Sequence, residues 1–164
     1  MSIRDDALAA NQIYASSFVK GDLPIAPAKK AAVITCIDAR LMPDQFLGFD
    51  IGDAHYVRNA GGMVTDDALR SLIIAHSLLG VNEFFVISHT GCGMTLFEDD
   101  QLRAKLKDDT GNDASGLEFG AFKDPEANVR RQVERLKASP FISKDAAVHG
   151  FVYQVEDGKL RPVV

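Results

Sequence analysis

The stretch from Ala31 to Ile37 reads Ala-Ala-Val-Ile-Thr-Cys-Ile, an apolar run of the length of one β-strand. Its apolar residues are continuous rather than alternating, which is typical of a parallel strand covered on both faces. A further strand-like run, Glu83 to Ser88, follows a helical pattern that begins at the N-cap candidate Thr65 and is closed by Gly80. The order strand, helix, strand predicts parallel strands with a right-handed crossover, and therefore an α/β fold.

The rest of the chain extends this pattern on both sides. We expect a mostly parallel central sheet of about four strands, an antiparallel strand at its C-terminal edge, helices on both faces and an N-terminal helical arm. The expected strands are 31–37, 54–59, 83–88, 147–155 and 160–164. After the arm, we expect a short helix that begins at Pro43 and three longer helices over 65–79, 96–106 and 125–138. We expect one domain over residues 1–164, in which residues 1–27 are the helical arm and its linker.

The N-terminal segment 1–21 carries apolar residues at helical spacing, with Asp5 and Asp6 near its start. The Pro-containing stretch from Leu23 to Pro27 then breaks regular structure. The helix is therefore predicted to stand off from the first strand on a tether. It can pack on a neighbouring subunit or fold back on its own sheet, and these residues leave both arrangements open.

Composition excludes several classes of protein. A chain of 164 residues with 46% hydrophobic and 25% charged residues is typical of a globular protein. No apolar run approaches the length of a membrane span, and the first ten residues lack a signal-peptide core, so we expect a cytoplasmic protein. The net charge of −5 argues against a general nucleic-acid binder. Two cysteines cannot form a disulfide framework, although a single disulfide remains open beside metal binding or reduced thiols.

Three candidate metal ligands follow two of the expected strands. Cys36 lies near the end of the first strand, His89 directly follows the strand 83–88, and Cys92 lies in the next turn. Neighbouring parallel strands end at the same sheet edge, where open α/β sheets build their sites. Two thiolates and one imidazole are a ligand set of catalytic zinc, with a fourth position left for water. Each residue alone also has a structural interpretation, as a small buried hydrophobe or a structural histidine; the set of three favours a metal.

Two further pairs of residues lie close to these ligands. Asp38 and Arg40 are predicted to form a carboxylate–guanidinium pair beside the metal, although an exposed pair of this kind contributes little stability. Paired, Asp38 would accept a hydrogen bond from a zinc-bound hydroxide; unpaired, it could itself occupy the fourth position. Gly61 and Gly62, at the exit of the second strand, permit a close approach of backbone to substrate.

The motifs Cys-Ile-Asp-Ala-Arg at 36–40, Arg-Asn-Ala-Gly-Gly at 58–62 and His-Thr-Gly-Cys-Gly at 89–93 resemble those of the β-class carbonic anhydrase family. The similarity extends over about residues 31–163. It implies a zinc enzyme with one Zn²⁺ per chain, held by Cys36, His89 and Cys92, with Asp38 and Arg40 as the gating pair and Asp38 as a ligand in a closed state. It also implies a homodimer or higher homo-oligomer in which the N-terminal helix embraces the partner.

The chain departs from many longer family members, which carry Ser-Asp-Ser-Arg where residues 37–40 read Ile-Asp-Ala-Arg, and a Gln that often helps bind substrate is not evident. It resembles a short subgroup that also contains carbonyl sulfide hydrolases. We expect hydration of carbon dioxide to bicarbonate by attack of zinc-bound hydroxide. The alternative is hydrolysis of carbonyl sulfide to hydrogen sulfide and carbon dioxide by the same mechanism. A non-catalytic zinc or redox binding module, or a zinc-free domain with a Cys36–Cys92 disulfide, remain as lesser alternatives.

Overall fold

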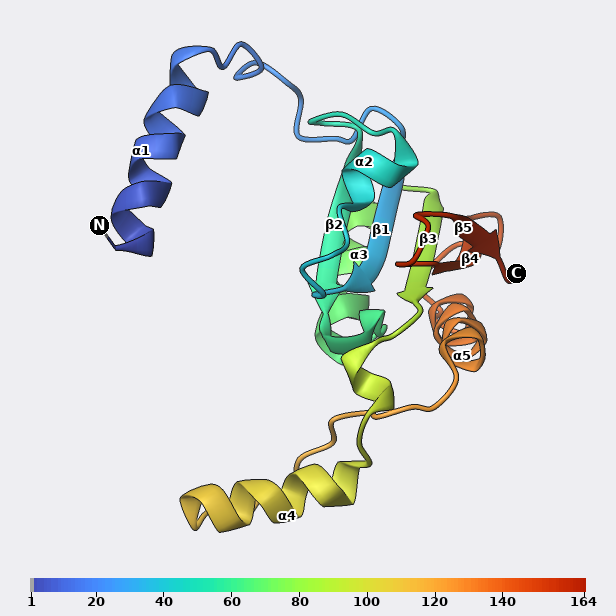
Figure 1. Cartoon of the computed structure of the whole chain (residues 1–164). Helices are drawn as coiled ribbons and strands as arrows, with labels where there is room; N and C mark the ends of the chain where they lie inside the picture. Colours follow the sequence, from blue (N-terminus) through green and yellow to red (C-terminus); the bar gives the residue numbers. More distant parts are fainter. Residues whose placement is uncertain (1) are drawn as a thin grey trace.

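A five-stranded sheet with the strand order β2-β1-β3-β4-β5 lies at the centre of the computed structural model, which describes residues 2–164 (Figure 1). Four strands are parallel and the last is antiparallel to its neighbour. This confirms the predicted fold class. The strands are β1 (Ala31–Cys36), β2 (Ala54–Asn59), β3 (Glu83–His89), β4 (Ala147–Tyr153) and β5 (Leu160–Pro162).

The connections between the strands are mainly helical. Helix α3 begins after Thr65, whose side chain accepts a hydrogen bond from the backbone N–H of Ala68, and ends at Gly80 in the left-handed conformation. Thr65 and Gly80 therefore cap the two ends of α3, as the sequence predicts. The helices are α1 (Ile3–Ser16), α2 (Pro43–Leu47), α3 (Asp66–Leu79), α4 (Asp99–Thr110) and α5 (Pro125–Lys137), with single 3₁₀ turns at η1 (Ala60–Gly62) and η2 (Gly93–Thr95).

The main core lies between the sheet and the two helices α3 and α5. Ile34 of β1 and Phe84 of β3 are buried there against Leu72 of α3 and Val133 of α5. On the opposite side, Phe46 of α2 packs against a second cluster that contains Cys36 and Cys92. Helices therefore cover both faces, as predicted, and the second cluster is built around the candidate metal ligands.

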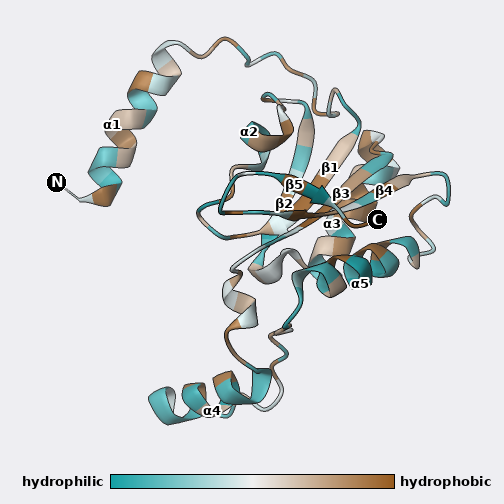
Figure 2. Cartoon of the chain, turned by 45° about the vertical axis from the view of Figure 1, so that its right-hand side comes forward, coloured by the Kyte–Doolittle hydropathy of each residue, from teal (hydrophilic) through white to brown (hydrophobic). Residues whose placement is uncertain are grey.

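Two helices stand away from the sheet (Figure 1). Neither α1 nor α4 contains a buried residue. The linker after α1 is held to the turn before β2, where Ala28 N–H donates to Gly52 O at 2.9 Å and Lys20 pairs with Asp50. Apolar side chains alternate with polar ones along α1, whereas α4 is mostly hydrophilic (Figure 2). In the single chain, then, α1 does not fold back on its own sheet.

The segment after the 3₁₀ turn η2 differs from the sequence prediction. A helix over 96–106 is expected from sequence, but α4 covers Asp99–Thr110. The reason is a capping box in which Glu98 N–H donates to the Gln101 side chain, so the helix starts only after Glu98. Across residues 2–164, no helix combines the length and apolarity that a membrane crossing requires.

Candidate metal centre

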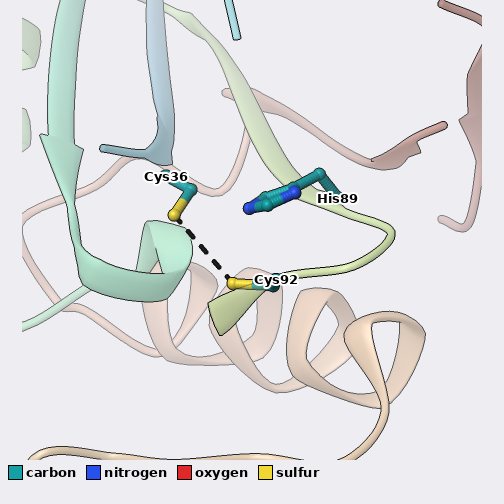
Figure 3. A group of neighbouring side chains, drawn as sticks. All are labelled: Cys36, His89 and Cys92. Carbon is teal, nitrogen blue, oxygen red and sulfur yellow. Dashed lines mark hydrogen bonds between the residues drawn. The ribbon is translucent and has the colours of Figure 1, made fainter. Parts of the chain in front are cut away.

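The three predicted ligands converge at one edge of the sheet (Figure 3). Cys36 is the last residue of β1 and His89 the last of the neighbouring parallel strand β3, while Cys92 returns in the turn that follows. All three side chains are buried, and their ligand atoms lie within 4.8 Å of one another. The two sulfur atoms are 4.0 Å apart, and the imidazole points toward them. Adjacency of β1 and β3 is thus what brings the ligands together.

The geometry of these donors fits a zinc ion. Zinc–sulfur bonds of about 2.3 Å at a tetrahedral angle would place two sulfurs about 3.8 Å apart, close to the observed separation. Nδ1 of His89 lies 2.9 Å from the carbonyl of Thr90, which can only accept, so Nδ1 carries the proton and Nε2 keeps its lone pair. That Nε2 is buried and has no hydrogen-bond partner within residues 2–164. A buried nitrogen that keeps its lone pair, lacks a hydrogen-bond partner and lies beside two thiols is the arrangement expected of a metal ligand.

The side chains of Cys36 and Cys92 are hydrogen-bonded to each other through their sulfur atoms. A hydrogen bond from Cys92 lowers the pKa of the Cys36 thiol, and burial opposes this shift. The same contact, together with burial, raises the pKa of Cys92. Cys36 is therefore the thiolate of the pair, and a cation between the sulfurs would take the place of the proton in this hydrogen bond.

Asp38 lies next to the ligands and is held by Arg40. Its Oδ1 accepts hydrogen bonds from the Arg40 backbone N–H and Nε, both at 2.9 Å, and its Oδ2 accepts one from Nη2 at 2.7 Å. These bonds keep the pKa of the Asp38 carboxyl well below its usual range. Nη2 of Arg40 also donates to Gly91 O at 2.9 Å. The predicted pair is present, and it connects the loop after β1 to the turn that carries Cys92.

Two residues of the motif at 58–62 support this loop, and the sequence prediction gave them no role. Arg58 donates to the carbonyl oxygens of Cys36 at 3.0 Å and Asp38 at 2.8 Å. Asn59 exchanges two hydrogen bonds with the backbone of Met63, at 2.6 and 2.7 Å, and so closes the turn that contains the glycines. Their position beside Gly61 and Gly62 was the only sign of this role in the sequence. A hydrogen bond from a guanidinium to the backbone of another strand leaves no local sequence pattern.

The two glycines have different surroundings. Gly61 lines a hollow of about 200 Å³ beside the ligands, together with Cys36, Ile37, Asp38, Ala60, Cys92, Gly93 and Met94. Gly62 lies outside this lining, and a Cβ atom on it would come within 3.1 Å of backbone atoms of Thr35, Cys36 and Ile87. Both have positive φ, 80° and 62°. The hollow therefore opens directly beside the candidate ligands, and contact of the glycines with substrate stays a prediction.

The chain is similar to proteins of known activity along nearly its whole length. A carbonic anhydrase family model matches residues 31–160. Beta-carbonic anhydrase 1 of Mycobacterium tuberculosis is 42% identical over 163 residues, 99% of each chain. Carbon disulfide hydrolase of Acidithiobacillus thiooxidans is 37% identical over 150 residues, 79% of this chain and 75% of that protein. The crystal structure of carbonic anhydrase from Streptococcus mutans matches with a TM-score of 0.96 at 41% identity, covering 100% of this chain and 99% of that one.

Proposed function

The chain belongs to the β-carbonic anhydrase family, and from this premise we propose that it hydrates carbon dioxide to bicarbonate with one zinc ion held by Cys36, His89 and Cys92. Bound zinc would supply a Lewis acid that makes a water molecule acidic near neutral pH. The observation that carries the proposal is the buried Nε2 of His89, which lies beside the sulfurs of Cys36 and Cys92 and has no hydrogen-bond partner within residues 2–164.

Asp38 and Arg40 orient the attacking water in this proposal. Both oxygens of Asp38 are held by Arg40, and Oδ2 lies 3.8 Å from Nε2 of His89. Because the pKa of Asp38 is held low, its carboxylate stays an acceptor at neutral pH. A hydrogen bond accepted by Oδ2 from water leaves the water's second lone pair directed toward the hollow, where the carbon of the substrate would lie.

A stopped-flow assay of carbon dioxide hydration by the full chain tests this function. We expect hydration in proportion to bound zinc, lost on treatment with a chelator and restored by one equivalent of Zn²⁺. The matched control is the Cys36→Ala variant given the same zinc, which should neither retain zinc nor hydrate carbon dioxide. Stoichiometric zinc without hydration, and with four protein ligands at every pH, would instead favour a non-catalytic zinc-binding module.

Hydrolysis of carbonyl sulfide or carbon disulfide is the second candidate. It is favoured by the apolar lining of the hollow, where Ile37 is 60% exposed, because sulfur is larger and less polar than oxygen. The similarity to a carbon disulfide hydrolase supports the same alternative. Release of hydrogen sulfide, measured beside carbon dioxide hydration on one preparation, separates the two: fast release without hydration would favour the sulfur substrates.

We further propose a homodimer or higher homo-oligomer. Helix α1 and its linker present apolar side chains that are largely exposed in the single chain, with exposed fractions of 75% for Ile13, 85% for Val19 and 83% for Ile25. An arm that carries several exposed apolar side chains is typical of a segment that packs on another subunit. A second copy of the chain is the partner proposed here, as the family resemblance implies.

A further inference from the structure

A buried polar network joins helix α5 to the glycine turn behind the metal centre. Asn128 and Gln132 lie one helical turn apart, and both are buried although their side chains are polar. From sequence, only the apolar residues of this helix, such as Val129 and Val133, are expected to face inward. Buried amides need hydrogen-bond partners, so the partners of these two side chains show what they hold in place.

The partners lie in the turn that follows β2. Nδ2 of Asn128 donates to Gly61 O at 3.2 Å and to Ser88 Oγ at 3.1 Å. Oε1 of Gln132 accepts a hydrogen bond from Val64 N–H at 2.9 Å. The two amides are also bonded to each other, with Nε2 of Gln132 donating to Oδ1 of Asn128 at 3.0 Å. Both ends of the segment from Gly61 to Val64 are thus tied to α5.

This segment forms one wall of the metal centre. Gly61 lines the hollow beside Cys36. Gly62 packs directly on the backbone where β1 ends at Cys36. The Gly61 carbonyl belongs to the peptide that joins Gly61 to Gly62, so a rotation of this peptide would move Gly62 away from the end of β1 and change the shape of the hollow. The Asn128 bond to Gly61 O opposes that rotation, because it holds the carbonyl of the same peptide.

We propose that Asn128 is a positioning residue of the metal centre, which holds the Gly61 carbonyl and thereby fixes the glycine turn against Cys36. Gln132 supports it by holding the amide of Asn128 in orientation. This inference rests on the proposed zinc function, because it assigns Asn128 to the support of that site. Asn128 contacts neither the hollow nor the ligand atoms, so its effect is expected on metal retention and turnover rather than on substrate affinity.

Variants of the full chain loaded with zinc test the proposal. Asn128→Ala removes the bond to Gly61 O. Val133→Ala is the control, because it shortens a buried side chain further along α5 that packs against Gly150 of β4 and makes no hydrogen bond to the turn. We expect about tenfold faster transfer of zinc to a chelator and about tenfold lower kcat in Asn128→Ala, with KM unchanged, as for other residues that support metal ligands. Val133→Ala should lose stability but release zinc at the wild-type rate.

Asn128→Asp covers the case in which the alanine variant fails to fold. It keeps the side-chain shape and the acceptor for Gln132, but it replaces the Nδ2 donor with an oxygen that repels Gly61 O, so the same faster zinc release is expected. The visible spectrum of the cobalt-substituted protein should change in this variant and not in Val133→Ala.

Failure of the positioning role of Asn128 and failure of the proposed reaction give different results. If the wild type hydrates carbon dioxide and both Asn128 variants match Val133→Ala in zinc release and spectrum, Asn128 is only structural and the positioning role is overturned. If the wild type retains zinc but does not hydrate carbon dioxide, while the Asn128 variants still release zinc faster, the proposed reaction fails and the positioning role stands.

Discussion

Oδ2 of Asp38 lies 3.8 Å from Nε2 of His89, while both oxygens of that carboxylate are occupied by hydrogen bonds from Arg40. In the proposed zinc enzyme, rotation of the Asp38 side chain would bring its carboxylate to a metal at His89, and the hydrogen bonds from Arg40 would oppose this rotation. The guanidinium binds the carboxylate through two parallel N–H groups, a geometry that a single ammonium cannot reproduce.

Replacing Arg40 by Ala should close the metal centre. The freed carboxylate of Asp38 would take the open position, so we expect zinc to be retained and hydration to fall by roughly a hundredfold. X-ray absorption of the zinc should show an added carboxylate ligand. The double variant Asp38→Ala/Arg40→Ala is the control, since it has no carboxylate to add and should keep an open position. Unchanged activity in Arg40→Ala would refute the gating role.

Cys92→Ala should remove both the metal and the stability that the metal provides. Binding to the folded state alone stabilises it, so a chelator lowers the melting temperature of a zinc protein. We expect that lowering in the wild type and none in Cys92→Ala, whose melting temperature should equal that of the metal-free wild type. Val133→Ala is the control for a general loss of stability, and it should still respond to the chelator. Stoichiometric zinc in Cys92→Ala would contradict its assignment as a ligand.

Gly62→Ala should destabilise the fold far more than Gly48→Ala. Both glycines have a φ near +60°, which costs about 1–2 kcal/mol for any other residue. A Cβ on Gly48 meets no heavy atom of residues 2–164 within 4 Å, whereas one on Gly62 meets backbone at 3.0–3.1 Å. We therefore expect about 1–2 kcal/mol for Gly48→Ala and about 3 kcal/mol or more for Gly62→Ala, because overpacking adds to the backbone cost. Urea unfolding measures the loss of stability in both variants. Equal losses would show that the close packing of Gly62 on backbone adds nothing to the cost of the substitution.

The loop after α4 should depend on the ionisation of Asp99. This carboxylate accepts hydrogen bonds from the backbone N–H groups of Phe119, Gly120 and Ala121, which lower its pKa. Because the pKa of Asp99 is lower in the folded state, its ionisation stabilises the fold at any pH above the pKa of the unfolded state, about 3.9. This stabilisation is lost as the pH falls through the pKa of the folded state.

Hydrogen exchange at the amides of Phe119 to Ala121 measures this effect. At pH 7, Asp99→Asn should speed their exchange, because the amide replaces one acceptor oxygen with a donor. Asp100→Asn is the control, since Asp100 is almost fully exposed and pairs only with Arg103 in the described part of the chain. Equal exchange in the two variants would argue that the loop is held by other contacts.

The strand pattern was sufficient to predict that the candidate metal ligands lie together at one edge of the sheet. Apolar runs place β1 and β3 as parallel strands, and the end of each strand carries a ligand, so the convergence of Cys36 and His89 follows from topology. The helix caps at Thr65 and Gly80 were equally local signals. These features depend on residues that are close in sequence or on the period of the apolar residues.

The hydrogen bonds that hold the loops around the candidate ligands could not be predicted in the same way. Arg58 and Asn128 act through hydrogen bonds to backbone carbonyls that lie 20 to 67 residues away. Nothing in the local sequence identifies such partners, and a polar residue such as Asn128 is not expected in the core. Its position next to Val129 on the inward face was the one available signal. Helix α4 was displaced for a different reason, because the cap at Glu98 outweighs the apolar residues before it.

Removal of residues 1–19 should convert the proposed dimer into a monomer with an intact sheet. The truncation removes α1, which has no buried residue in the single chain, and leaves Lys20 to pair with Asp50. Since the sheet and its two clusters contain no residue of α1, the circular dichroism spectrum should lose only helical signal. Sedimentation velocity at matched concentrations measures the mass of both chains.

A pair of point variants tests whether apolar contact of the arm is the cause. Ile13→Glu places a charge on a side chain that is 75% exposed in the single chain and that would be buried in the dimer, so it should shift the equilibrium toward monomer. Asn11→Glu adds the same charge on the same helix at a position that is already polar, and it should leave the dimer intact. Equal dissociation by both variants would point to charge repulsion rather than apolar packing, and a full-length chain that sediments as a monomer would exclude α1 as a dimer contact.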